Sequence, residues 1–86
     1  MRLIFTDFFQ RDYRSLPSRV QRALDKALKF LLENPRHPSL HMKKIPGTAI
    51  WYARVSRAYR FTFQFEADAI TLRRVGTHAI FAKERR

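Results

Sequence analysis

Residues 59–65 constrain the fold most, because large apolar and polar side chains alternate along them. The run Tyr59-Arg60-Phe61-Thr62-Phe63-Gln64-Phe65 has a side-chain period of two. Its aromatic residues therefore point to one face of a strand, and its polar residues point to the other. We interpret the longer segment from Ile50 to His78 as three such strands, with a buried aromatic face and an open face that carries arginines. An arginine-bearing open face indicates an anionic ligand.

A three-residue hairpin loop at residues 56–58 sets the register of the first two strands. It pairs Arg54 with Arg60 and Ala53 with Phe61, so both strands agree on which face is buried. Like charges directly opposite one another are unfavourable by roughly 0.2 to 1 kcal/mol. The arginine pair therefore indicates a compensating phosphate or carboxylate. A solvated basic face is the alternative interpretation.

A turn between the second and third strands extends this register. It pairs Thr62 with Arg73 and Arg60 with Val75. With this register, Arg73 joins Arg54 and Arg60 on the polar face.

The segment before the sheet is predicted to hold one strand and two helices. Residues 2–5 form a short strand, and a brief helix begins near Phe8. A second helix begins at residues 17–18, ends at residues 34–35 and has one apolar stripe: Val20, Leu24, Ala27, Leu28 and Leu31. The order β-α-α-β-β-β indicates an α+β fold, with an antiparallel sheet and the two N-terminal helices packed on one face.

Length and composition favour a single domain over residues 1–86 that folds without a cofactor. Eight phenylalanines supply apolar surface for a core, and there is no cysteine. His37 and His41 have no nearby carboxylate cluster, so we expect no metal site. The sequence has no signal-peptide pattern and no run of 18 apolar residues, which favours a cytoplasmic protein with no membrane partner.

The net charge of +11 predicts a polyanionic partner. Residues 1–35 carry seven basic and four acidic groups, whereas residues 36–86 carry eleven and three. Most of the positive field therefore comes from the half of the chain that forms the sheet. RNA, DNA or an acidic protein would supply the negative charge that compensates this surface.

His78 is the candidate for proton transfer. It follows the third strand at the end where Arg60 and Arg54 lie, beside a basic pocket of phosphate size. RNA can be cleaved without metal if a base removes the 2′-OH proton, cations stabilise the phosphorane and an acid protonates the leaving oxygen. Histidine suits proton transfer near neutral pH. The alternative is that His78 is merely a polar residue after a strand.

Other residues on the open face and in the preceding loop are candidates for holding RNA. Tyr52 lies on the arginine face, where its ring could stack on a base. The full set of RNA-binding candidates is His41, Lys43, Lys44, Tyr52, Arg73 and Phe81.

Several short motifs resemble the RelE/ParE toxin superfamily over nearly the whole chain. The more specific ones are the Tyr-Arg step of the second sheet strand and the Val-Gly-X-His sequence that ends the third. The matching segments are Lys43-Lys44-Ile45-Pro46-Gly47, Trp51-Tyr52-Ala53-Arg54-Val55, Tyr59-Arg60-Phe61 and Val75-Gly76-Thr77-His78.

The resemblance implies a ribosome-dependent, metal-independent endoribonuclease that cleaves mRNA. It also implies a small antitoxin that neutralises the toxin and binds operator DNA together with it. In nucleases of this kind, residues at the positions of Arg54, Arg60 and His78 act on the scissile phosphate. An antitoxin is expected to lay an acidic segment across the basic face.

The chain departs from the family pattern after His78. Several family nucleases carry a tyrosine in this segment, whereas Phe81 is the only aromatic residue among residues 79–86 and has no proton to give. In a histidine-type site, as in the YafQ and YoeB branches, Phe81 could pack beside the base. Two alternatives stay open: a ParE-like toxin that acts on DNA gyrase, and a catalytically inactive basic module that binds nucleic acid.

Overall fold

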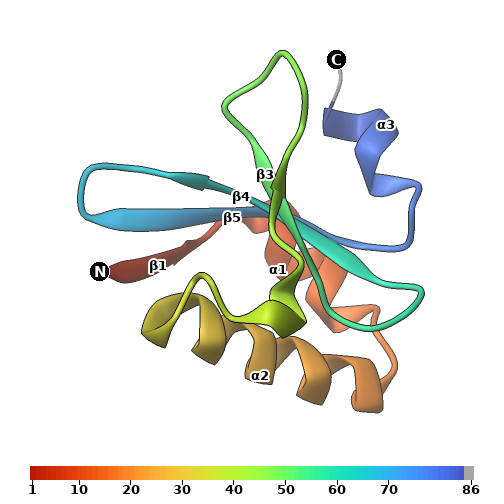
Figure 1. The fold of residues 1–86 in the computed structure, drawn as a ribbon. Helices are drawn as coiled ribbons and strands as arrows, with labels where there is room; N and C mark the ends of the chain where they lie inside the picture. Colours follow the sequence, from red (N-terminus) through yellow and green to blue (C-terminus); the bar gives the residue numbers. More distant parts are fainter. Residues whose placement is uncertain (85–86) are drawn as a thin grey trace.

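A computed structural model of the chain describes residues 1–84, which form a five-stranded sheet with helices on both faces (Figure 1). The strands are β1 (Arg2–Phe5), β2 (Lys43–Lys44), β3 (Trp51–Arg54), β4 (Arg60–Phe65) and β5 (Ala69–Gly76). The helices are α1 (Asp7–Arg14), α2 (Ser18–Glu33), the short 3-10 helix η1 (Pro38–Leu40) and α3 (Ile80–Glu84). The α+β class and the β-α-α order at the start of the chain are confirmed.

The sheet is mixed, and this corrects the expectation of an antiparallel sheet. Its order is β1-β5-β4-β3-β2, in which β1 pairs with β5 in parallel and the other neighbours pair antiparallel. A parallel pair needs a long crossover, and α1, α2 and the remaining strands supply it. The sequence pattern of residues 2–5 contained no signal for their partner strand.

The predicted register of β3 and β4 is confirmed. Arg54 lies opposite Arg60, and Ala53 lies opposite Phe61. The hairpin loop closes with hydrogen bonds from the Val55 and Ser56 backbone N–H groups to the Tyr59 carbonyl, at 3.0 and 3.3 Å.

The register of β5 differs from the prediction beyond Leu72, because the strand contains a bulge. Thr62 pairs with Arg74, and Arg73 is the extra residue with no partner on β4. The bulge moves Val75 opposite Phe61 and into the core, where it is 2% exposed. The predicted Thr62–Arg73 and Arg60–Val75 pairs are therefore wrong. A strict period of two places Leu72 and Val75 on opposite faces, so a bulge is needed to bring both to the face that packs against the core.

The core lies between the aromatic face of the sheet and the first two helices. All five residues of the predicted α2 stripe are buried, and four of them, Leu24, Ala27, Leu28 and Leu31, belong to the core cluster together with Phe9 of α1. Thr6 caps α1, because its Oγ1 accepts a hydrogen bond from the Phe9 N–H at 3.2 Å. The same hydroxyl donates to the Leu72 carbonyl at 2.7 Å, which fixes the start of α1 against β5.

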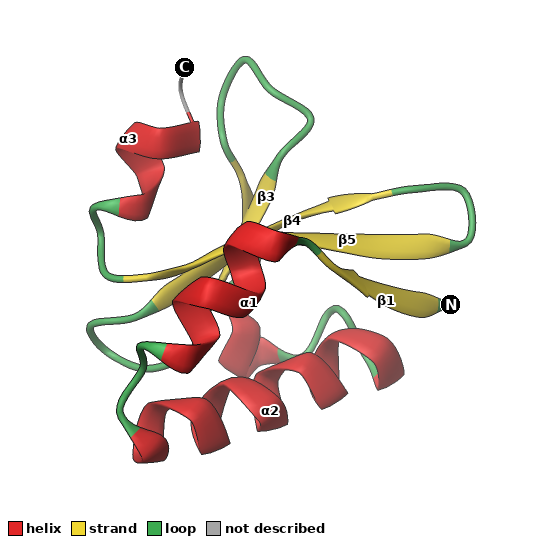
Figure 2. Ribbon diagram, turned by 180° about the vertical axis from the view of Figure 1, so that it is seen from behind, coloured by secondary structure: helices red, strands yellow, loops and turns green. Residues whose placement is uncertain are grey.

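Helix α1 packs against β5 beyond the point where β1 ends (Figure 2). Asp12 accepts hydrogen bonds from the Val75 backbone N–H at 3.1 Å and from Arg74 Nε at 2.9 Å. A carboxylate thus satisfies a strand donor that the short β1 does not reach. This contact fixes the end of β5 from which the chain continues to His78.

Helix α3 lies on the opposite face of the sheet from α2 (Figure 1). No pattern in the sequence predicted this helix. Thr62, on the polar side of β4, is fully buried. Gly76 permits the close approach of α3, because a Cβ atom at this position would lie 2.9 Å from Cγ2 of Ile80. The predicted open face is therefore partly covered.

Candidate functional site

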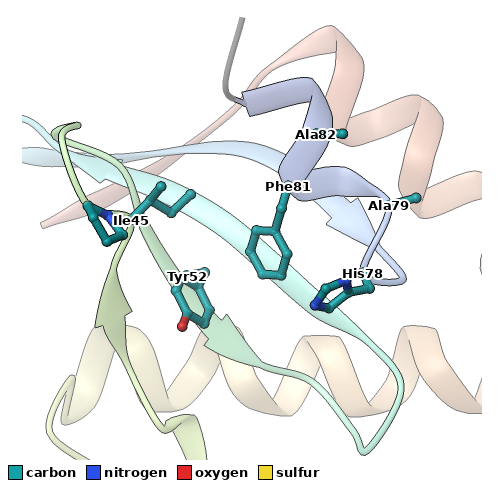
Figure 3. Close-up of a pocket in the computed structure, with 7 residues that line it drawn as sticks. Ile45, Tyr52, His78, Ala79, Phe81 and Ala82 are labelled. Carbon is teal, nitrogen blue, oxygen red and sulfur yellow. The ribbon is translucent and has the colours of Figure 1, made fainter.

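A hollow of about 570 Å³ lies between the start of the β2–β3 loop and α3 (Figure 3). Ile45 and Pro46 line one side, and Ala79 and Ala82 line the other. Tyr52, His78 and Phe81 complete the lining, and we call this site the aromatic hollow.

Phe81 lies between the other two rings of the aromatic hollow. Its ring centroid is 4.9 Å from that of Tyr52 and 5.3 Å from that of His78, with interplanar angles of 71° and 84°. Edge-to-face contacts of this kind fix ring positions. His78 is exposed, whereas Tyr52 and Phe81 are half-buried. The fold thus brings together three predicted site residues from β3, from the segment after β5 and from α3, and two of them carry a transferable proton.

Arg73, one of the RNA-binding candidates, contacts α3 through two of its three guanidinium nitrogens. Its Nε and Nη2 donate to the two carboxylate oxygens of Glu84, at 2.9 and 3.1 Å. The Glu84 side chain is 4% exposed, so this pair is largely shielded from water on one side. Residue spacing gives no signal for a contact between β5 and the segment after His78, so the role of Glu84 could not be predicted from the sequence.

The two lysines of β2 face in different directions. Lys43 pairs with Tyr52, and Lys44 pairs with Trp51. Directly paired residues project from the same face of a sheet, so Lys43 lies beside Tyr52, whereas Lys44 projects from the other face. His41 lies just before β2 and ends η1 with a left-handed backbone, at a φ of 44°. All three RNA-binding candidates before Tyr52 are exposed, but only Lys43 shares its face.

One guanidinium nitrogen of Arg60 is hydrogen-bonded to the loop of the β3–β4 hairpin. Its Nη1 donates to the carbonyls of Ser56, Tyr59 and Arg57, at 2.6, 2.9 and 3.3 Å. In residues 1–84, its Nε and Nη2 make no hydrogen bond and so keep their donors for a ligand.

Arg54 lies opposite Arg60 but lines a different hollow, between β3, α2 and η1. The three predicted catalytic residues are therefore not gathered in one cavity. His78 lines the aromatic hollow, while the arginine pair marks the end of the β3–β4 hairpin.

The aromatic hollow contains no negative charge of its own. None of the residues that line it is acidic. Within residues 1–84, no group of three or more histidine or acidic side chains could hold a metal ion. None of the helices in the same range is long and apolar enough to cross a membrane.

Comparisons with known proteins find similarity in structure only. No protein-family model and no curated protein matches the chain. A YoeB/ParE toxin from Agrobacterium tumefaciens superposes with a TM-score of 0.79 at 15% identity, over 91% of this chain and 99% of that one. The chain has the RelE/ParE toxin fold.

Other structures with the RelE/ParE fold were solved with an antitoxin. The RelB–RelE antitoxin–toxin complex from Methanococcus jannaschii superposes with a TM-score of 0.76 at 19% identity, over 94% of this chain and 96% of that one. The E. coli DinJ–YafQ complex superposes with a TM-score of 0.77 at 15% identity, over 91% and 93%. The resemblance read from the short motifs is thus confirmed at the level of the fold.

Proposed function

We propose that the chain is the toxin of a type II toxin–antitoxin system and cleaves mRNA on the ribosome without a metal ion. The observation that carries this proposal is the aromatic hollow, in which His78 and Tyr52 flank Phe81. Lys43 lies beside Tyr52 on the same face, and no acidic side chain lines the cavity. A site of this composition suits a polyanion with stacked bases.

His78 transfers protons in the proposed reaction. One proton leaves the 2′-OH, whose oxygen attacks phosphorus, and the bond to the 5′ oxygen breaks as that oxygen gains a proton. Arg60 and Arg54 stabilise the charge that develops on the phosphate. The free Nε and Nη2 donors of Arg60 support this role. Tyr52 provides a ring on which a base of the mRNA stacks.

The expected partner is an acidic antitoxin. The RelE and YafQ toxins with this fold form complexes with RelB and DinJ. An acidic segment of the antitoxin would compensate the net charge of +11 and cover Lys43 and Arg54. Charge reversal at Arg54 would then weaken the complex. Operator DNA would bind only to the complex of the two proteins, and the complex would act in the cytoplasm.

One observation favours a ParE-like toxin that binds DNA gyrase and has no nuclease activity. Arg60 Nη1 is held by three carbonyls of its own hairpin, and Arg54 lines a separate hollow from His78. Such a toxin needs no proton-transfer group, so His78→Ala would leave it fully toxic.

The test is induced expression without an antitoxin, with His78→Ala and Arg60→Ala beside the wild type. Growth and primer extension on a translated reporter mRNA are measured together. We expect growth arrest and cuts in the reading frame for the wild type, and neither for the variants. Arrest without cuts would favour gyrase, and no arrest would favour an inactive binding module.

A further inference from the structure

A second hollow, of about 430 Å³, lies between α2, η1 and β3. We call it the α2 hollow. Lys26, His37, Ser39 and Arg54 supply its polar lining, and Phe30 supplies an aromatic wall. Its volume is in the range of ligand-binding pockets. No carboxylate lines it, so its charged groups are all cationic.

The hydrogen bond that His37 accepts leaves its other ring nitrogen as the donor. Its Nδ1 accepts a hydrogen bond from the Ser39 backbone N–H at 3.1 Å, which caps η1. In the neutral imidazole the proton therefore lies on Nε2. The ring stacks on Phe30 with a centroid distance of 3.9 Å and an interplanar angle of 8°, so its orientation is fixed.

Lys26 and Arg54 bring positive charge to the α2 hollow from two elements. The Lys26 ammonium lies 5.8 Å from the centroid of the Phe30 ring. Arg54 is half-buried, and neither residue forms a salt bridge within residues 1–84. Two cations without a counter-ion beside a histidine donor are suited to a phosphate group, which accepts several hydrogen bonds at once.

We propose that the α2 hollow binds a backbone phosphate of RNA, away from the bond that is cleaved. Arg54 pairs with Arg60 across the hairpin and also lines this hollow, so it connects the two sites. Beyond Tyr52, β3 has no partner in β2, so this edge of the sheet is uncovered by β2. The RNA passes from the face of the aromatic hollow around this edge to the α2 hollow. Phosphate contacts of this kind position a strand and carry no sequence information. This inference rests on the proposed function.

The binding test uses a short single-stranded RNA with 2′-O-methyl groups, which cannot be cleaved. Its affinity is measured by fluorescence anisotropy for the wild type, Lys26→Gln and His37→Asn. Asparagine retains an acceptor for the Ser39 N–H and so preserves the cap. The matched control is Lys29→Gln, because Lys29 is exposed on the same helix but does not line the α2 hollow.

We expect Lys26→Gln and His37→Asn each to weaken RNA binding about fivefold to tenfold more than Lys29→Gln does. For Lys26→Gln, the slope of log K against log salt concentration falls in magnitude by about 0.7, the value for one phosphate contact to a single strand. Equal losses for Lys26→Gln and Lys29→Gln, with the oligonucleotide and with purified ribosomes alike, would overturn the proposal. Unchanged RNA binding with weaker binding of an acidic peptide would also overturn it and assign the hollow to a protein partner.

A second measurement separates messenger from ribosomal RNA and this inference from the proposed function. If Lys26→Gln weakens binding of the oligonucleotide, the phosphate belongs to the single strand. If it weakens only binding to purified ribosomes, the phosphate belongs to ribosomal RNA, and both results support an RNA phosphate site. If the wild type cleaves no mRNA but Lys26→Gln still weakens RNA binding, the proposed function is refuted and the phosphate site in the α2 hollow is supported. If the wild type cleaves mRNA, and Lys26→Gln and Lys29→Gln have equal cleavage rates and equal RNA affinities, the phosphate site in the α2 hollow is refuted and the proposed function is not.

Discussion

Arg73 and Glu84 form a bidentate ion pair that connects α3 to β5. Arg73 is also the bulged residue of its strand, so its side chain is released from the regular alternation and reaches Glu84. Since Phe81 lies on α3, this ion pair fixes one wall of the aromatic hollow. The bulge, the ion pair and the hollow are therefore parts of one arrangement.

Replacing Glu84 with Gln is expected to destabilise the protein. The substitution removes the charge that both Arg73 nitrogens contact, in a side chain that is 4% exposed. Hydrogen bonds to charged groups contribute about 1.5 to 3 kcal/mol, so we expect a loss in this range in urea unfolding. Glu33→Gln, at the exposed end of α2, is the control and should change stability by less than about 0.5 kcal/mol. Equal effects of the two substitutions would mean that the ion pair does not hold α3.

Replacing Gly76 with Ala is expected to push α3 away from the sheet. The new Cβ would lie 2.9 Å from Cγ2 of Ile80, which is buried. Overpacking costs about 1 to 3 kcal/mol. This cost exceeds the roughly 0.5 to 1 kcal/mol that alanine gains over glycine in a strand.

A double-mutant cycle isolates this contact between Gly76 and Ile80. Ile80→Ala removes the atom that the new Cβ would meet. The cost of Gly76→Ala, measured by thermal unfolding, should therefore be smaller by about 1 kcal/mol in the Ile80→Ala background. Additive costs would contradict the proposed close approach.

Tyr13 is expected to titrate at a higher pH than an ordinary tyrosine. Burial raises the pKa of the Tyr13 hydroxyl above its usual 10.0, and the hydrogen bond to Asp25 and the charge of Asp25 raise it further. The hydroxyl lies 3.0 Å from Asp25 Oδ1. Because the folded pKa is the higher one, the stabilising contribution is complete below the unfolded pKa near 10. It is lost as the pH rises through the folded pKa.

The phenolate absorbance of the wild type minus that of Tyr13→Phe reports this titration directly. The same difference in the Asp25→Asn background should give a lower midpoint. An unchanged midpoint would show that Asp25 does not influence the Tyr13 hydroxyl.

Tyr52 is expected to act through its ring and not through its hydroxyl. Its ring contacts Phe81 in the aromatic hollow, where a base can stack beside it. Base–aromatic stacking contributes about 1 to 3 kcal/mol, so Tyr52→Ala should raise KM for mRNA cleavage by about tenfold or more. Tyr52→Phe retains the ring and should leave kcat and KM within about threefold of the wild type. A large fall in kcat for Tyr52→Phe would instead assign a proton-transfer role to the hydroxyl.

The β3–β4 register could be predicted from the sequence, but the β5 register could not. Residues 59–65 alternate strictly, and a short hairpin loop leaves one pairing that buries Ala53 and Phe61 together. In β5 the apolar residues Leu72 and Val75 are three positions apart, which conflicts with a period of two. The bulge at Arg73 resolves the conflict through tertiary packing, which periodicity alone does not reveal.

The candidate site was predictable where it depends on strand faces and motifs. Tyr52 and His78 were singled out on those grounds, and they line one hollow together with Phe81. The contacts of Arg73 with Glu84, and of Arg60 with its hairpin carbonyls, depend on side-chain conformations. Such contacts leave no periodic signal in the sequence.

Cleavage of a defined mRNA on purified ribosomes, without antitoxin, tests the central claim most directly. The wild type and His78→Gln are compared on ribosome-bound and on free mRNA, because glutamine is polar and similar in size but does not transfer protons near neutral pH. We expect the wild type to cut only the ribosome-bound mRNA and His78→Gln to be slower by about 100-fold or more. A wild type that cuts neither RNA, or a His78→Gln variant that cuts at the wild-type rate, would contradict the proposed ribonuclease site at His78.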